Sequence, residues 1–361
     1  MTQKKFTVLA IDGGGIRGIL AAKFLASMEA ELQRQGKEPR LRHHFDLICG
    51  TSTGSIIALA LALDIPAQDI VELYRNNARR IFCKRSFGWV WSKYSRKPLE
   101  RLVREVYRRK GTVDPCIIDL ETRVCIPAYD LLTAAPRVFK TPHAPQLFRD
   151  QHIPAYMAAL ASAAAPTYFN PYTSSYPDIL TGAEEQFQLK VDGGVFANNP
   201  ALTGLIEAHR GLGVDLKNIR LLSIGTGRST YSESRQRSFW GIFPKPWGRL
   251  YWLRKTRLLD MFMQAQSQAT DFMVQILSGG VGAVKTSLFL YERVSVELGA
   301  QVKLPLDTKR KRNIKVLEEY GSREFQKQGT RIIQAFIDGN SYRNYTPPTY
   351  TRHQPNPSAN G

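Results

Sequence analysis

The sequence lacks an apolar run long enough to cross a bilayer, and it is poor in cysteine. Its longest apolar run covers only residues 56–63, whereas a membrane-spanning helix needs about 20 apolar residues. The four cysteines, Cys49, Cys83, Cys116 and Cys125, form no C-x-x-C pair. This spacing favours neither a zinc site nor a disulfide framework, so we expect no bound metal and no cofactor.

We also expect no export signal, and we find no internal repeats in the sequence. Residues 1–5 run directly into a strand-like stretch rather than into the apolar core of a signal peptide, which leads us to expect a cytoplasmic protein. Strand-like and helix-like stretches alternate from residue 6 to about residue 338. This alternation predicts one α/β domain, residues 1–339, with a sheet covered by helices. Residues 340–361 are rich in Pro, Asn, Ser and Tyr, and we expect a disordered tail there.

Acidic residues are scarce relative to basic ones. Fifty Lys and Arg against 31 Asp and Glu give a formal net charge of +19. Such an excess attracts polyanions, which include nucleotides, nucleic acids and anionic membrane surfaces. Charge alone does not choose among these partners, and it also serves solubility.

A glycine-rich turn follows the first expected strand, residues 6–11. Residues 12–18 read D-G-G-G-I-R-G, and helical apolar spacing begins directly after them. Glycines at a helix start allow backbone N–H groups to face outward, where the helix dipole favours an anion. Such groups suit the oxyanion that forms in acyl transfer. The candidates for this role are Gly13, Gly14, Gly15 and Arg17.

A second glycine turn carries the candidate nucleophile. Residues 12–18 also match the dinucleotide fingerprint G-x-G-x-x-G, but the second strand, residues 45–49, does not end in the acidic residue that would hold a ribose. It ends in G-T-S-T-G, which an apolar helix follows. G-x-S-x-G between a strand and a helix is typical of a nucleophile elbow. The motif predicts Ser52 as the nucleophile, flanked by Gly50 and Gly54.

A serine nucleophile needs a base within hydrogen-bond reach. A short strand, residues 188–191, ends in Asp192, which Gly193 and Gly194 follow. Open α/β sheets place their sites at strand ends, and the glycines leave room for a side chain from a neighbouring strand. Asp192 is therefore the candidate base, although D-G-G is also a common turn.

Two other functions remain open at this point. A Ser-His-Asp α/β hydrolase acting on small esters would use His143, His152 or His209. The usual chain order of serine, acid and histidine disfavours it, and leaves His209 as its remaining candidate. A nucleotide-binding module without catalysis would also fit the basic charge.

The motifs at residues 12–18, 50–54 and 192–194, in that order, resemble the three signatures of the patatin-like phospholipase family. Residues 161–169, A-S-A-A-A-P-T-Y-F, look like the helix and turn that the family carries between its serine and its aspartate. The resemblance covers about residues 6–230. It implies a three-layer α/β/α sandwich with a mostly parallel central sheet and a Ser-Asp dyad without histidine.

The resemblance also implies a reaction. Ser52 attacks the ester carbonyl of a membrane phospholipid, Asp192 serves as general base and then as general acid, and the first glycine turn stabilises the oxyanion. The basic character is further similar to that of phospholipase effectors in bacterial cyclic-nucleotide anti-phage systems. This likeness implies a cyclic dinucleotide activator, for example cyclic GMP-AMP, and a peripheral position at the inner membrane in the active state. We expect no nucleic acid duplex as partner and leave a homo-oligomer open.

All five tryptophans fall in two stretches rich in Lys and Arg. They are Trp89 and Trp91 within residues 86–97, and Trp240, Trp247 and Trp252 within residues 237–257. Tryptophan prefers the membrane interface, and Lys and Arg favour anionic headgroups. The stretches are open to three interpretations: a membrane-facing lip over Ser52, ordinary core, or a site for the phosphates of a nucleotide.

Overall fold

The structure, a computed structural model, describes residues 5–83, 92–108, 111, 113–229, 257–279, 287–299, 304–337 and 345–352. All five tryptophans lie outside these ranges, so the three interpretations of the tryptophan stretches remain predictions. No helix within the described ranges is long and apolar enough to cross a bilayer.

A mixed sheet of eight strands runs through the described part of the chain, in the order β5-β6-β3-β2-β1-β7-β9, with β4 beside β3. The strands are β1 (Phe6–Ile11), β2 (Leu47–Gly50), β3 (Arg123–Asp130), β4 (Ala135–Lys140), β5 (Tyr172–Pro177), β6 (Glu184–Asp192), β7 (Ile219–Ile224) and β9 (Leu290–Val294). The run from β3 to β9 is parallel, whereas β4, β5 and β6 pair antiparallel. A separate short pair joins β8 (Arg228–Ser229) to β10 (Glu297–Leu298).

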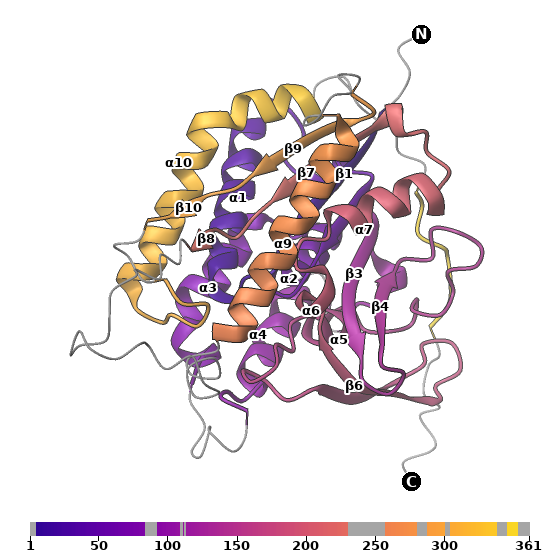
Figure 1. Cartoon of the computed structure of the whole chain (residues 1–361). Helices are drawn as coiled ribbons and strands as arrows, with labels where there is room; N and C mark the ends of the chain where they lie inside the picture. The colour runs from indigo at the N-terminus through magenta and orange to yellow at the C-terminus, as the bar shows by residue number, and fades with distance from the viewer. Residues whose placement is uncertain are drawn as a thin grey trace, which may run out of the picture.

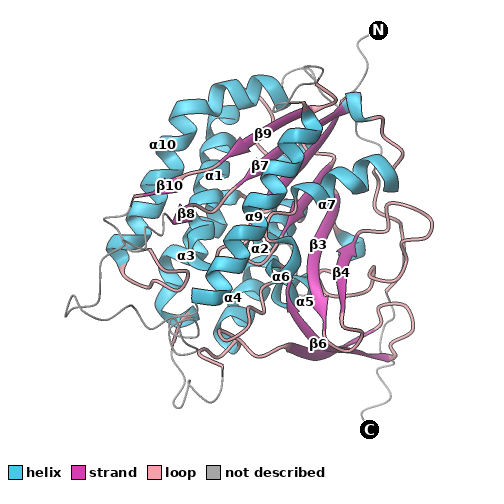
Figure 2. Ribbon diagram, viewed as in Figure 1, coloured by secondary structure: helices cyan, strands magenta, loops and turns pink. Residues whose placement is uncertain are grey.

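Helices cover both faces of this sheet (Figure 1, Figure 2). On one face lie α1 (Gly18–Arg34), α2 (Thr53–Ala62), α3 (Ala67–Ile81), α4 (Lys97–Tyr107), α5 (Ala155–Ser162) and α10 (Lys311–Phe336). On the other face lie α7 (Ala201–Ile206) and α9 (Arg257–Ser278). The short helix α6 (Gly194–Ala197) directly follows β6. The expected three-layer α/β/α arrangement with a mostly parallel sheet is confirmed.

The central strand β1 shows why two layers of helices are needed. Successive side chains of a strand point to opposite faces. Leu9 and Ile11 belong to the core shared with α1, α2 and α10, while Phe6, Val8 and Ala10 belong to the core shared with α7 and α9. Because all five side chains are buried, β1 is almost continuously apolar, with Thr7 as its one polar residue, as is typical of internal parallel strands.

The structure describes residues 345–352 of the expected tail. The hydroxyl of Tyr350 is hydrogen-bonded to Asp119, and Nη2 of Arg352 lies 2.5 Å from Oδ2 of the same carboxylate. These contacts hold this part of the tail against the domain. The division of the chain at residue 339 stays a prediction.

Candidate active site

Three turns meet at one edge of the sheet. The first follows β1 and the second follows β2, and these strands are parallel neighbours in which Ile11 pairs with Gly50. Asp192 ends β6, which runs antiparallel to β3. The aspartate reaches the same edge because β3 extends beyond β2: Cys49 pairs with Cys125 of β3, whereas Asp192 pairs with Ala128, three residues further along.

Ser52 and Asp192 are in direct contact. The Oγ of Ser52 donates a hydrogen bond to Oδ2 of Asp192 at 2.7 Å, and the amide of Gly194 donates to Oδ1 at 2.7 Å. Both the serine and the aspartate are buried. The fold therefore brings together the two residues that the sequence singled out, 140 positions apart.

The turn at Ser52 has the geometry of a nucleophile elbow. Ser52 adopts φ +55° and ψ −122°, a region that non-glycine residues rarely occupy. Its amide donates to Oγ of Ser162 at 2.9 Å. A Cβ at Gly50 would collide with the carbonyl of Gly54, and a Cβ at Gly54 with the carbonyl of Ile11. The two motif glycines thus let the turn pack closely enough to hold the serine in this conformation.

Burial changes the acidity of the candidate base. Desolvation raises the pKa of Asp192 from its usual range near 4 to about 7, while the hydrogen bonds from Ser52 and Gly194 favour the charged form and oppose that rise. A base with a pKa near neutrality can accept a proton from the serine and later return it.

This pKa predicts the pH profile of the reaction. General base catalysis needs the ionised form of Asp192, so kcat/KM should increase as pH rises through about 7 and level off above it. The measurement is hydrolysis of a soluble short-chain ester at a series of pH values. A flat profile across neutral pH would contradict the assignment of Asp192 as base.

The glycine turn after β1 offers two amides rather than three. The amide of Gly13 donates to the carbonyl of Asn198 at 3.0 Å, so it is already engaged within the fold. Gly14 directly precedes the short 3-10 helix Gly15–Arg17, and Gly15 is the first residue of that helix. The amides of these two glycines have no acceptor in the part of the chain that the structure describes. Unpaired N–H groups are expected at a helix start, and these two are available to an oxyanion.

Arg17 lines a surface cleft together with Gly13 and Gly14. Its Nε donates to the carbonyl of Leu304 at 2.6 Å, and the side chain is buried. The expected positive charge therefore stands beside the turn, and Arg17 also holds the backbone at Leu304 in place.

Substitution of Gly14 tests the turn. A Cβ at this position would collide with the side chain of Thr226, whose hydroxyl donates to the carbonyl of Gly13 at 2.6 Å. Gly14→Ala should therefore displace the turn and lower kcat by about a hundredfold, the usual cost of one lost oxyanion donor. Gly111→Ala, where an added methyl meets nothing within 4 Å, is the matched control. Equal kcat in the two variants would argue against a role for the turn.

An apolar cavity opens beside Ser52. Gly15 and Ser52 form one part of its wall. The rest is mainly hydrophobic and comes from four helices and three connecting segments: Thr53, Ile56, Tyr74, Ile81, Phe82, Leu99, Ala163, Ala165, Tyr168, Phe169, Leu259, Met263 and Leu306. The segment at residues 161–169 therefore contributes to this wall and, through Ser162, to the position of Ser52. Apart from Thr53, which belongs to the G-T-S-T-G motif, the remaining lining residues carry no sequence motif.

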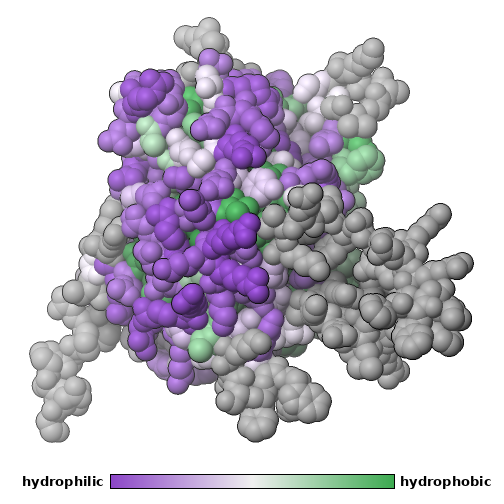
Figure 3. Space-filling view, turned by 90° about the vertical axis from the view of Figure 1, so that its left-hand side faces the viewer, coloured by the Kyte–Doolittle hydropathy of each residue, from purple (hydrophilic) through white to green (hydrophobic). Residues whose placement is uncertain are grey.

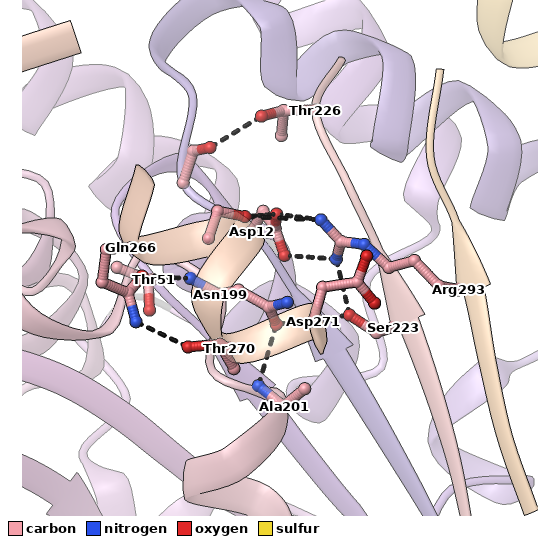
Figure 4. Close-up of polar contacts among 12 residues, drawn as sticks. Asp12, Thr51, Asn199, Ala201, Ser223, Thr226, Gln266, Thr270, Asp271 and Arg293 are labelled. Atoms are coloured by element: carbon pink, nitrogen blue, oxygen red, sulfur yellow. Dashed lines mark hydrogen bonds and ion pairs between the residues drawn. The ribbon is translucent and has the colours of Figure 1, made fainter. Parts of the chain in front are cut away.

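A buried ion pair between Arg293 and Asp12 holds the start of the first glycine turn in place (Figure 4). Arg293 of β9 binds Asp12 through two hydrogen bonds of 2.7 and 2.5 Å. Ser267 of α9 donates to Asp12 at 2.7 Å, and Arg293 donates to Ser223 of β7 at 2.6 Å. Burial works against the charge of Arg293, yet the neighbouring Asp12 carboxylate raises its pKa above the usual range. No sequence motif marks Arg293, because its contact with Asp12 spans 281 positions.

The loop after α6 is hydrogen-bonded to helix α9 (Figure 4). The amide of Asn199 donates to Oε1 of Gln266 on α9 at 3.1 Å. The side-chain oxygen of Asn199 accepts from the amide of Ala201 at 3.0 Å, as expected for a residue at a helix start, and from Ser223 at 3.3 Å. Helix α9 therefore holds both the turn after β1 and the loop that follows Asp192.

The three histidines considered for a triad have other partners. His143 lies between Thr141 at 2.7 Å and Glu207 at 2.9 Å. Nδ1 of His209 bonds the carbonyl of Val214 at 2.9 Å, and His152 bonds Asp178. Within the described ranges, no group of three or more His, Cys, Asp or Glu side chains is arranged to hold a metal ion.

Comparison with known proteins identifies the class. The patatin-like phospholipase family matches residues 9–205, which is more than half of the chain. The chain belongs to the patatin-like phospholipase family.

Three relatives refine the comparison. A cGAMP-activated phospholipase of Vibrio cholerae serotype O1 is 33% identical over 246 residues, which cover 63% of this chain and 66% of that protein. A cGAMP-activated phospholipase of Escherichia coli strain TW11681 is 35% identical over 242 residues, 63% of this chain and 64% of that protein. Patatin-like protein 1 of Oryza sativa subsp. indica is 31% identical over 307 residues, 76% of this chain and 71% of that protein. The chain thus spans slightly less than two thirds of the length of the two cGAMP-activated relatives.

Proposed function

We propose that this chain is a serine phospholipase that releases fatty acids from membrane phospholipids through a dyad of Ser52 and Asp192. The observation that carries the proposal is the 2.7 Å hydrogen bond from the Ser52 hydroxyl to the buried Asp192 carboxylate. The apolar cavity beside Ser52 supports a fatty acyl chain as the group transferred. Membership of the patatin-like phospholipase family supports the same substrate class.

The reaction would proceed in two halves. Ionised Asp192 takes the proton of Ser52 as Oγ attacks the ester carbonyl, and the oxyanion that forms is stabilised by the amides of Gly14 and Gly15. Asp192 then gives its proton to the leaving lysophospholipid alcohol, which leaves an acyl-enzyme. In the second half, water attacks the acyl-enzyme while Asp192 accepts its proton, and the fatty acid departs as the proton returns to Ser52.

We further propose that a cyclic dinucleotide such as cyclic GMP-AMP activates the enzyme, in anti-phage defence at the inner membrane. The names of the Vibrio and Escherichia relatives support this activator. The net charge of +19 is favourable for binding an anionic nucleotide as well as an anionic membrane surface. Assembly of the chain into a homo-oligomer belongs to the same proposal.

Fatty-acid release from phospholipid vesicles tests the function. The chain is incubated with vesicles alone and with each member of a panel of cyclic dinucleotides. We expect release that depends on one of these nucleotides in the wild type, and none in Ser52→Ala. Binding of a nucleotide without release by the wild type under any condition would favour the module without catalysis.

A further inference from the structure

The helix α9 is turned with its apolar side toward the outside. Its exposed large side chains are Met261, Phe262, Phe272, Met273, Ile276 and Leu277. The other exposed positions among residues 258–278 are two alanines and one glutamine, so this side carries no charge. The buried positions include Ser267, Thr270 and Ser278. A helix on the surface of a globular protein normally has the opposite distribution.

The apolar surface continues onto the elements that pack against α9. Val195 of α6 and Ile206 of α7 are exposed, as is Leu288, whose amide donates to the carbonyl of Ser278 at 3.1 Å. We call the six α9 side chains together with Val195, Ile206 and Leu288 the α9 patch. It contains nine of the 15 large hydrophobic side chains that are exposed among the described residues. Apolar exposure is therefore concentrated on one surface, and such patches mark interaction sites.

A neighbouring side of the molecule provides a contrast. Figure 3 shows the side where α10 runs, which lies at the left of Figure 1, and its described surface is mainly hydrophilic. Helix α9 lies across the front of the sheet in Figure 1. The two long helices on these two sides therefore present different chemistry to the surroundings.

The α9 patch borders the cavity beside Ser52. Leu259 and Met263, on the same helix, line that cavity. Val195 lies three positions after Asp192, and the Met263 methyl group packs against Gly194. An acyl chain that enters the cavity from an apolar phase would therefore pass the edge of the patch.

We infer that the α9 patch docks the protein on the surface of a phospholipid membrane and sets the cavity beside Ser52 against the lipid. The inference rests on the proposed function. A lipid surface fits better than a second copy of the chain because the helix that carries most of the patch also lines, through Leu259 and Met263, the cavity that must admit the substrate. Since this side of α9 carries no charge, attachment comes from apolar burial, and it should occur on zwitterionic lipid and persist at high salt.

Vesicle flotation tests the docking surface. The full chain carrying Ser52→Ala, which removes hydrolysis, is mixed with phosphatidylcholine vesicles at high salt, with and without cyclic GMP-AMP. Phe262→Glu combined with Phe272→Glu replaces side chains that are 58% and 57% exposed, and should lower the vesicle-bound fraction by about tenfold or more. Phe148→Glu, at a phenylalanine that is 68% exposed outside the patch, is the matched control and should change binding less than twofold.

Two further measurements keep this inference separate from the proposed function. With Ser52 intact, the double glutamate variant should hydrolyse a soluble short-chain ester as the wild type does, while its hydrolysis of vesicles falls in proportion to its binding. A wild type that hydrolyses neither substrate contradicts the proposed function, but flotation still tests the patch. Equal flotation of the double variant and Phe148→Glu overturns the docking surface. Sedimentation velocity without lipid gives a second possible contradiction. The docking surface would also be overturned if the wild type were a dimer, the double glutamate variant were a monomer, and both bound vesicles equally.

Discussion

Asp192→Asn is expected to lower the kcat of ester hydrolysis by about 10³- to 10⁴-fold, at the upper end of what a general base contributes. Asparagine keeps the size of the side chain and can still accept a hydrogen bond from Ser52, but it cannot take the proton. The variant should therefore fold as the wild type does. The measurement is hydrolysis of a soluble ester, with circular dichroism to compare the folded states.

His209→Ala is the informative control for Asp192→Asn. His209 is the histidine that the chain order of serine, acid and histidine would use, but its ring bonds the carbonyl of Val214. We expect its removal to leave kcat within a few-fold of the wild type. If His209→Ala lost activity while Asp192→Asn kept it, the dyad would be wrong and a histidine-dependent hydrolase would take its place.

Arg293→Met is expected to cost about 3–5 kcal/mol of the free energy of unfolding, because it leaves the buried carboxylate of Asp12 without a countercharge. Asp12 and Arg293 are both largely enclosed, with 4% and 11% of their side chains exposed. The loss should also reduce ester hydrolysis, since Asp12 directly precedes the glycine turn. Urea unfolding followed by circular dichroism measures the stability.

Two comparisons show whether burial of the ion pair causes the loss of stability in Arg293→Met. Arg331→Met removes an ion pair with Glu292, also on β9, but the arginine side chain is 57% exposed, and surface pairs contribute about 0–1 kcal/mol. Asp12→Asn combined with Arg293→Met removes both charges and should recover part of the stability lost in Arg293→Met alone. Equal destabilisation by Arg293→Met and Arg331→Met would contradict the importance of the buried pair.

The sequence identified the residues that sit in short motifs at strand ends. Ser52 and Asp192 could be found because a strained turn and a turn of two glycines leave clear patterns. The helix α7 ends at Ile206, and a π-helical turn, Glu207–Gly211, follows it. Such a change of hydrogen-bond pattern depends on tertiary packing and leaves no mark in the spacing.

Other parts of the site could not be read from the chain. The amide of Gly13 turns toward Asn198, and that orientation depends on a loop 185 residues away. Arg293 is one arginine in a basic sequence until β9 places it beside Asp12. Asp192 reaches the edge of the sheet in a different way from the one expected, because its strand runs antiparallel to β3 and pairs with the far end of that longer strand.

The orientation of α9 about its own axis is fixed by two polar anchors on consecutive residues. Gln266 accepts from the backbone of Asn199 and Ser267 donates to Asp12, and neighbouring positions on a helix point about 100° apart. Rotation of the helix about its axis in either direction would therefore break one of these hydrogen bonds. These hydrogen bonds keep Phe262, Phe272, Met261 and Met273 exposed, although burial of these side chains away from water would favour the opposite orientation.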